Sequence, residues 1–319
     1  MNAPHPAGST AFDPRILRRA LGNFATGVTI VTARDGEDMV GVTANSFSSV
    51  SLDPPLVLWS IDKRSGSLPV FRRATHFAIN VLAMDQIELS NRFARPHEDR
   101  YAGVSWRTGE GGCILLDGTS ANFQCEKVEI LEGGDHWILI GRVRAFEDRG
   151  TAPLLYHQGS YAMALPHPRR QQPQGVAAGD AAANDLQARL ADHPYFLMTQ
   201  AVRSYQESYQ PRQIQTGWRP GEARLLMILN DSPARDMAAL ARQADMPQHQ
   251  VEQTLDLLRS RDLVERTADG EALTEAGATQ VRGIWAMARS HEERVFARFD
   301  RTQVETFKQV LRGIIAAPA

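Results

Sequence analysis

A run of small polar side chains at residues 41–58 is the part of the sequence best suited to hold a ligand. Its order, GVTANSFSSVSLDPPLVL, puts hydroxyl and amide groups before a turn at Asp53-Pro54-Pro55 and an apolar strand. Such groups, with backbone N–H groups at an irregular strand end, can hydrogen-bond the edge of a planar heterocycle without covering its face. A hairpin with local side chain to backbone bonds has the same composition, so composition alone leaves both interpretations open.

A second polar segment, SIDKRSGSL at residues 60–68, follows that strand directly. Lys63 and Arg64 stand among serines before a predicted helix, and cations near a helix N-terminus suit a phosphate. Taken alone, a solvated turn is the simpler interpretation. Neither GxxxxGK[ST] nor GxGxxG occurs in the chain, which argues against a P-loop or a Rossmann site. A dinucleotide would have to be bound in another way.

Short β-rich runs surround these segments, and few helices separate them, which favours an antiparallel barrel or sandwich over a repeated βαβ sheet. Asp13 as N-cap and Pro14 in the first turn predict a helix that ends at Gly22. A second helix is expected over residues 85–93. The expected strands lie at residues 27–33, 39–44, 56–61, 77–82, 123–131 and 137–146.

The sequence changes character near residue 170, where Pro, Gln, Gly and Ala follow one another without apolar periodicity. We predict domains at residues 1–168 and 186–319, joined by a linker at 169–185. The second domain shows helical patterns and one short hairpin at Asp269-Gly270, in the order of a winged helix. Its expected helices lie at about residues 194–210, 221–229, 236–243 and 247–260, with one long helix from residue 275 onward.

The overall composition is that of an ordinary globular chain, with 319 residues, 43% hydrophobic residues and a net charge of −2. No window has the roughly 18 apolar residues of a membrane helix, and the N-terminus lacks a signal-peptide pattern, so we expect a cytoplasmic protein without membrane contact. Cys113 and Cys125 form no CxxC pair and predict buried thiols rather than a disulfide or a metal site. The charge gives no general attraction to nucleic acid.

Six blocks between residues 12 and 166 follow one another in a recognisable order and spacing. They are RRALGNFATGVTIVTA, GVTANSFSSVSLDPPLVLWSIDKRS, FAINVLA, LSNRFA, EGGDHWILIGRV and PLLYHQGSY. Together they resemble the short-chain flavin reductases that serve two-component aromatic monooxygenases. The resemblance implies a split, Greek-key β-barrel that dimerises and holds FMN or FAD in a groove near the subunit interface. NADH is the expected reductant, because no arginine cluster awaits the 2′-phosphate of NADPH.

Carried over residue by residue, the resemblance assigns both polar segments to this groove. His136, in the triplet Gly134-Asp135-His136, matches the block associated with the nicotinamide. Hydride passes directly between the two rings, so the protein mainly aligns them, and His136 is expected to orient or stabilise charge rather than to act as a general base. The flavin-binding residues implied are Thr43, Ala44, Asn45 and Ser46 at the ring edge, Ser60, Lys63, Ser65 and Ser67 at the ribityl and phosphate, and Asn80, Arg92 and Phe93 in the lining. Tyr161 is a further cofactor-binding residue, in a block close to that of the nicotinamide.

Residues from 221 onward resemble the MarR family of winged-helix regulators, through DLV at 262–264 and LTEAG at 273–277. Acidic residues balance the basic ones in the corresponding recognition helix and wing, which argues against DNA binding. MarR-type domains also bind small aromatic acids, and the two-domain layout is similar to that of the reductase components of 4-hydroxyphenylacetate 3-hydroxylases. The candidate effector residues are Arg203, Tyr195 and Tyr205, unless these side chains only pack the dimer helices.

The sequence therefore predicts a homodimeric NADH-dependent flavin reductase that supplies free reduced flavin to a separate flavin-dependent oxygenase. An aromatic acid bound to the C-terminal domain is expected to stimulate it, because reduced flavin released without a substrate would react with oxygen and waste NADH. Two other interpretations remain open. One is a flavin-linked MarR-type regulator that binds DNA, and the other is a flavin-binding partner without turnover.

Overall fold

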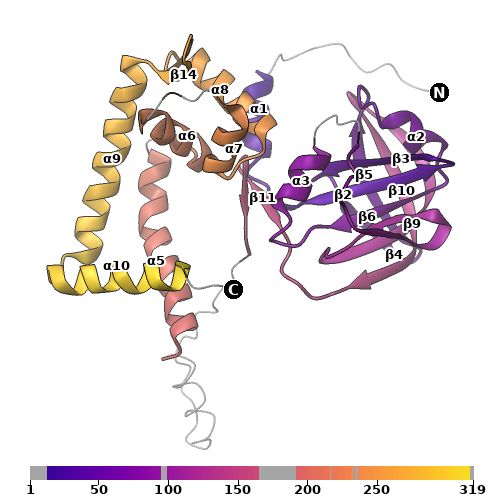
Figure 1. The fold of residues 1–319 in the computed structure, drawn as a ribbon, viewed down its shortest axis with the longest axis horizontal. Helices are drawn as coiled ribbons and strands as arrows, with labels where there is room; N and C mark the ends of the chain where they lie inside the picture. The colour runs from indigo at the N-terminus through magenta and orange to yellow at the C-terminus, as the bar shows by residue number, and fades with distance from the viewer. Residues whose placement is uncertain are drawn as a thin grey trace, which may run out of the picture. The chain divides into compact units, whose positions relative to one another are not determined.

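The computed structural model describes residues 13–94, 99–164, 192–215, 217–231, 233 and 236–316 (Figure 1). The chain divides into two compact units, Met1–Ala164 with Met237–Leu257, and Leu165–Asp236 with Leu258–Ala319. The predicted linker at residues 169–185 lies outside the described residues. Within the part of the chain that is described, every helix is too short or too polar to cross a membrane.

The first unit is built on one antiparallel sheet with the strand order β3-β2-β6-β9-β10-β5-β4. Its edge strands β3 and β4 are joined by residues 45–47 alone, so the sheet curves back on itself (Figure 1). The strands are β2 (Thr29–Asp35), β3 (Asp38–Ala44), β4 (Ser48–Leu52), β5 (Pro55–Asp62), β6 (His76–Val81), β9 (Ala121–Gly133) and β10 (His136–Asp148).

Short elements complete this unit. The helices α2 and α3 both pack against β2 and β3, and α1 begins as predicted, with the Asp13 carboxylate accepting from Arg15 N at 2.9 Å. The remaining elements are α1 (Pro14–Leu21), β1 (Thr26–Gly27), α2 (Leu68–Arg73), α3 (Ile87–Phe93), β7 (Trp106–Thr108), the 3₁₀ helix η1 (Glu110–Gly112), β8 (Ile114–Leu116), β11 (Leu155–His157), β12 (Ser160–Ala162), α7 (Met237–Ala244) and most of α8 (Gln248–Ser260).

The core of the sheet is formed by strands whose buried and partly exposed residues alternate, and β5 shows this alternation most clearly. Val57, Trp59 and Ile61 are buried on one face, which leaves Ser60 and Asp62 on the other. Gly141 lets β10 cross this core, because a Cβ there would lie 2.4 Å from the Phe77 ring. Both cysteines are free and buried, as predicted, and burial raises the pKa of Cys113 to about 11.

The second unit contains α5 (Pro194–Gln215), α6 (Pro220–Asp231), β13 (Val264–Thr267), β14 (Gly270–Leu273), α9 (Glu275–Phe296) and α10 (Arg301–Ala316). Helix α6 packs against α9 and β14, and α5 packs against α9. The predicted single helix from residue 275 onward is wrong, because the chain forms two helices there. Asp300 accepts from Gln303 N and Gln303 Oε1 accepts from Asp300 N, both at 2.9 Å, and this reciprocal cap starts α10.

The β-rich N-terminal half and the helical C-terminal region confirm the predicted fold class at that level. The assignment of the C-terminal region to a MarR-like winged helix stays a prediction.

Candidate functional site

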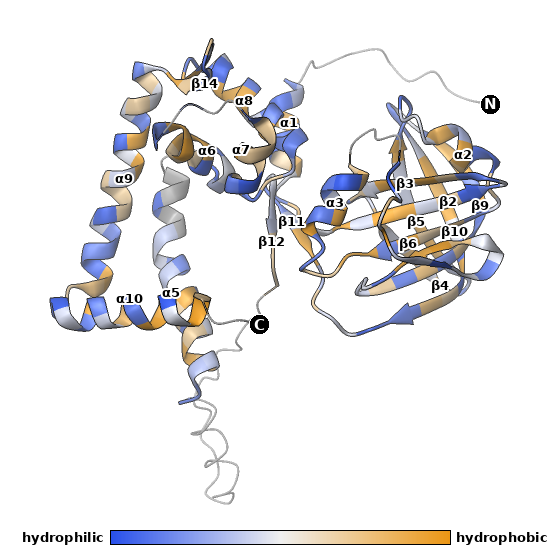
Figure 2. Ribbon diagram, in the orientation of Figure 1, coloured by the Kyte–Doolittle hydropathy of each residue, from blue (hydrophilic) through white to orange (hydrophobic). Residues whose placement is uncertain are grey.

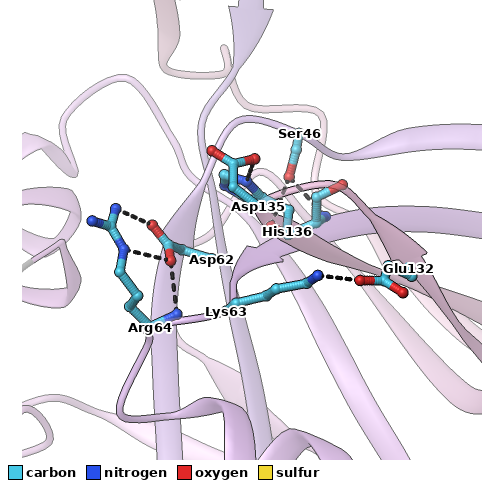
Figure 3. A network of polar contacts seen from close by, with 8 residues as sticks. Ser46, Asp62, Lys63, Arg64, Glu132, Asp135 and His136 are labelled. Atoms are coloured by element: carbon cyan, nitrogen blue, oxygen red, sulfur yellow. Dashed lines mark hydrogen bonds and ion pairs between the residues drawn. The ribbon is translucent and has the colours of Figure 1, made fainter. Parts of the chain in front are cut away.

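The polar segments that the sequence singled out meet at one end of β5 (Figure 3). Strand β10 pairs with β5 so that His136 lies opposite Asp62 and Ile138 lies opposite Ser60. The hairpin that carries His136 and the loop that follows β5 therefore lie next to each other, at the same end of these two paired strands.

The segment after β3 is fixed to β5 by a pair of bonds through Ser46. Its hydroxyl donates to the Ser60 carbonyl at 3.1 Å and accepts from the Ser60 N–H at 2.9 Å. Neighbouring Asn45 is exposed, while Ala44 is buried and accepts from the Thr29 hydroxyl through its carbonyl at 2.7 Å. The structure thus brings the predicted ring-edge residues beside the loop at residues 60–68.

The His136 ring is held by its sequence neighbour. Its Nδ1 lies 2.7 Å from Asp135 Oδ1, and this bond, with the charge of the ring, lowers the pKa of Asp135. The Asp135 carbonyl also accepts from the Lys63 N–H at 3.0 Å, which ties the hairpin to the loop after β5. With Nδ1 donating to the carboxylate, Nε2 is the ring nitrogen available to a ligand.

Both cations of the loop have carboxylate partners. The Lys63 ammonium pairs with Glu132 and lies 5.2 Å from the Trp137 ring centroid. Arg64 donates to Asp62 through Nη2 at 2.8 Å and through its backbone N–H at 2.7 Å. These bonds lower the pKa of Asp62 to about 2.

A further cation at this site, Arg100, was missed by sequence reasoning. Its Nη1 donates to the Gly41 carbonyl and, at 3.3 Å, to the hydroxyl of buried Ser67. The Ser65 hydroxyl in turn accepts a bond from the Ser67 N–H at 3.4 Å. Partial burial lowers the pKa of Arg100. No motif marks Arg100 in the sequence, because only the fold brings it to β3.

Helix α3 gathers other predicted residues. Thr43 Oγ1 donates to the Ser90 carbonyl at 2.7 Å, and Tyr161 Oη lies 2.9 Å from Ser90 Oγ. Arg92 donates to the Ala102 carbonyl at 2.6 Å, and Phe93 is buried. These side chains are therefore placed by the packing of α3 against β3.

Asn80 is not brought to this group. It is fully buried inside the sheet, where Nδ2 donates to Ile30 O and Thr32 Oγ1, both at 3.1 Å, and Oδ1 accepts from Leu116 N at 3.0 Å. This bonding favours a structural role, and its assignment to the groove stays a prediction.

The predicted effector residues lie on α5 of the second unit. Arg203 donates to Glu207 at 2.8 Å, and Tyr195 is separated from Tyr205 by ten residues of helix, about 15 Å. The Tyr205 ring instead makes an edge-to-face contact with the His291 ring, and the two ring centroids are 4.6 Å apart. His291 is 2% exposed and was not singled out from the sequence. Its burial lowers its pKa.

The donor set of the first unit suits a planar heterocycle with an anionic tail. Neutral hydroxyls and an exposed amide lie along residues 43–46, an imidazole stands at the β9–β10 hairpin, and Arg100 stands at the other end of the loop. Hydroxyls and amides can bond ring nitrogens and carbonyls, and a guanidinium can bond a phosphate.

Residues 21–164 match the family described as flavin reductase like domain. A probable flavin reductase of Rhizobium meliloti is 53% identical over 151 residues, which are 47% of this chain and 49% of that protein. The reductase component of a flavin-dependent trigonelline monooxygenase of Acinetobacter baylyi is 50% identical over 148 residues, 46% of this chain and 48% of that protein. FMN reductase (NADH) SmoA of Agrobacterium fabrum is 46% identical over 147 residues, 46% of this chain and 84% of that protein. The match thus spans about half the length of the first two relatives.

Proposed function

The chain belongs to the family of flavin reductase like domains, and on that premise we propose that it reduces FMN or FAD with NADH. The observation that carries the proposal is the meeting of Ser46, Ser60 and the His136 hairpin at one end of β5 (Figure 3). Neutral donors and an oriented imidazole together suit two stacked heterocycles better than they suit a hydrolytic substrate.

The residues present fit a flavin by the chemistry of their donors. Asn45 would meet the polar edge of the ring through its exposed amide, and Thr43 and Ser46 would meet it as acceptors, because their hydroxyl protons are donated to the Ser90 and Ser60 carbonyls. Ser60 and Ser65 would meet the ribityl hydroxyls. A bound flavin supplies the ring atom that accepts hydride from the reduced nicotinamide, so the chain needs no nucleophile of its own.

The chain's contribution is orientation. Asp135 holds the His136 ring through Nδ1, so that Nε2 can donate to or accept from the nicotinamide carboxamide. The bond between the Asp135 carbonyl and Lys63 N fixes this hairpin against the loop that would hold the flavin. A fixed distance between the two binding segments is what alignment of two rings requires.

The direct test is NADH oxidation by the full chain with FMN, FAD or riboflavin added, followed at 340 nm. We expect turnover that rises with flavin concentration and is absent without flavin. No turnover with any flavin, in protein that still binds flavin by fluorescence quenching, would favour the alternative of a binding partner without turnover.

We further propose that the reduced flavin passes to a separate flavin-dependent monooxygenase acting on an aromatic substrate. Relatives named as monooxygenase reductase components support this partner. A coupled assay checks it, with such an oxygenase held apart from the chain by a dialysis membrane. Hydroxylated product on the oxygenase side is expected, and its absence there would exclude transfer of free flavin.

The second unit is proposed to bind an aromatic acid that stimulates the reductase, as in the 4-hydroxyphenylacetate hydroxylase layout. The aromatic cluster of Tyr205, Tyr209 and His291 supports this proposal, and Arg203 lies two residues before Tyr205 on α5. NADH oxidation with and without 4-hydroxyphenylacetate and related acids tests it. A rate that is indifferent to every acid would exclude effector control.

A homodimer is proposed as well, supported by exposed apolar side chains on α5 and α10. Figure 2 shows that α10 carries several hydrophobic residues along its length. Sedimentation equilibrium at micromolar concentration measures the mass directly. The alternative of a DNA-binding regulator is not favoured, since the arginines at the end of α8 and in the hairpin, Arg259 and Arg266, both pair with buried Glu271 at 2.7 and 3.0 Å.

A further inference from the structure

Three cations border the loop between β5 and α2, and they differ in what neutralises them. Lys63 pairs with Glu132, and Arg64 pairs with Asp62. Arg100 contacts only neutral acceptors, the Gly41 carbonyl and the Ser67 hydroxyl, and among the described residues no carboxylate pairs with it. It therefore brings a positive charge to the site that no described side chain neutralises.

The free edge of this guanidinium is suited to an anion. Both of its bonds use Nη1, so Nη2 and Nε have no partner among the residues that the structure describes. These two nitrogens form the planar fork that binds two oxygens of one phosphate. A partly buried cation without a counterion is costly, and a bound phosphate would remove that cost.

The position of Arg100 is set by β3 rather than by the loop. The next residue, Tyr101, donates to the Val40 carbonyl at 2.8 Å while Arg100 binds Gly41. Only glycine fits at position 41, since a Cβ there would lie 2.5 Å from the Phe93 ring. Two consecutive side chains thus hold the guanidinium against the strand, which preorganises it for binding.

Arg100 also lies at the correct end of the site for a flavin tail. Gly41 and Thr43 are two residues apart on β3, so they share one face of the strand at a separation of about 7 Å. Thr43 begins the polar wall proposed for the ring edge, whereas His136 lies on the β9–β10 hairpin. A phosphate at Arg100 would belong to the molecule that also meets Thr43.

We infer that Arg100, and not Lys63, binds the phosphate of the flavin in this chain. The inference rests on the proposed function and adds a residue that determines specificity for phosphorylated flavins over riboflavin. The same guanidinium chemistry would also suit the pyrophosphate of NADH, so the test must separate these two sources of phosphate.

The experiment compares FMN with riboflavin, which lacks only the phosphate, in fluorescence titrations of the full chain. For Arg100→Gln we expect the Kd for FMN to rise about 10- to 100-fold, with the Kd for riboflavin changed less than about twofold. Arg100→Lys keeps the charge without the fork and should raise the Kd for FMN about 3- to 10-fold. Lys63→Gln should have a smaller effect on FMN than Arg100→Gln has.

Arg73→Gln is the matched control, because Arg73 is an arginine of the same unit that pairs with Asp35 and Asp38. It should leave both flavin affinities unchanged. If Arg100→Gln does not fold, the lysine variant and the salt dependence of FMN binding carry the test. Added KCl should weaken FMN binding to the wild type, and Arg100→Lys should keep this slope because it keeps the charge, while its loss of affinity should be confined to FMN.

Three results would overturn the inference while leaving the reductase activity intact. They are an equal loss of FMN and riboflavin affinity, a larger loss in Lys63→Gln than in Arg100→Gln, and a raised KM for NADH without a change in the Kd for FMN. Failure of the proposed function looks different, because the wild type itself would then neither bind nor reduce any flavin.

Discussion

Replacing Asn80 tests whether this residue holds the sheet together or lines the groove. In Asn80→Ala, three buried hydrogen bonds of 3.0–3.1 Å are lost, each worth about 1 kcal/mol. The Leu116 N–H is then left buried without its acceptor, which adds about 1 kcal/mol. We therefore expect the free energy of unfolding of the first unit to fall by about 4 kcal/mol.

Amide hydrogen exchange of peptides from β2 and β6, read by mass spectrometry, measures this change, since it reports on that sheet separately from the second unit. Asn23→Ala is the control, because Asn23 is exposed and accepts a bond from Gln158 at 3.1 Å. It should cost less than about 1 kcal/mol. A change below 1 kcal/mol in Asn80→Ala, together with a tenfold loss of FMN affinity, would refute the structural role and place Asn80 in the groove.

Three further changes test the charges of both units. Asp135→Asn should raise the KM for NADH about 3- to 10-fold in steady-state kinetics while the Kd for FMN stays the same, because the amide no longer holds the His136 ring by charge; an unchanged KM would contradict this role. The second change is Asp62→Asn. Because the pKa of Asp62 is lowered from 3.8 to about 2, its bond to Arg64 stabilises the fold fully above about pH 4, and this contribution is lost as the pH falls towards 2. In thermal melts, the free energy of unfolding of Asp62→Asn should be lower than that of the wild type by less than about 1 kcal/mol at pH 6 and equal to it near pH 2. Burial lowers the pKa of His291 below 6.5, so the second unit should lose stability as the pH falls below about 6.5, and circular dichroism melts of His291→Phe should lack this dependence; a parallel decline in both proteins would contradict it.

The sequence predicts those helices and strands that are specified by residues within or next to them. The Asp13-Pro14 pair marks the start of α1, and the alternation in LVLWSI marks β5. The break between α9 and α10 was also marked, because Asp300 and Gln303 have the spacing of a reciprocal cap. The apolar pattern that continues on both sides of this cap predicts one uninterrupted helix instead.

Other elements depend on distant partners and left no local signal. Strand β11, three residues long, exists because it pairs with β1, where Gly27 lies opposite Leu155. Strand β8 likewise owes its place to β7 and to the Asn80 side chain, which binds the Leu116 N–H. Sequence periodicity over three residues cannot distinguish such strands from loops.

The candidate site divides in the same way. Residue types at positions 41–68 indicated hydrogen bonding to a heterocycle, and the fold does join these segments through Ser46 and Ser60. The charge balance was beyond reach of the sequence, since Lys63 finds its carboxylate at Glu132 and Arg100 finds Gly41 across nearly sixty residues. Pairing across such distances is decided by the sheet register, not by neighbours in the chain.

This charge balance bears on how firmly a flavin would be held. With Lys63 and Arg64 neutralised by carboxylates, Arg100 would provide the charge-assisted bond at the phosphate, and the other donors proposed for the flavin, apart from Arg92 on α3, are neutral. Neutral hydrogen bonds contribute about 1 kcal/mol each in net terms, so such a site favours micromolar rather than nanomolar affinity, since those Kd values differ by about 4 kcal/mol. A protein proposed to hand reduced flavin to a separate oxygenase must release it at every turnover. A second unpaired cation at the phosphate would slow that release, and the pairing of Lys63 with Glu132 and of Arg64 with Asp62 would avoid this cost.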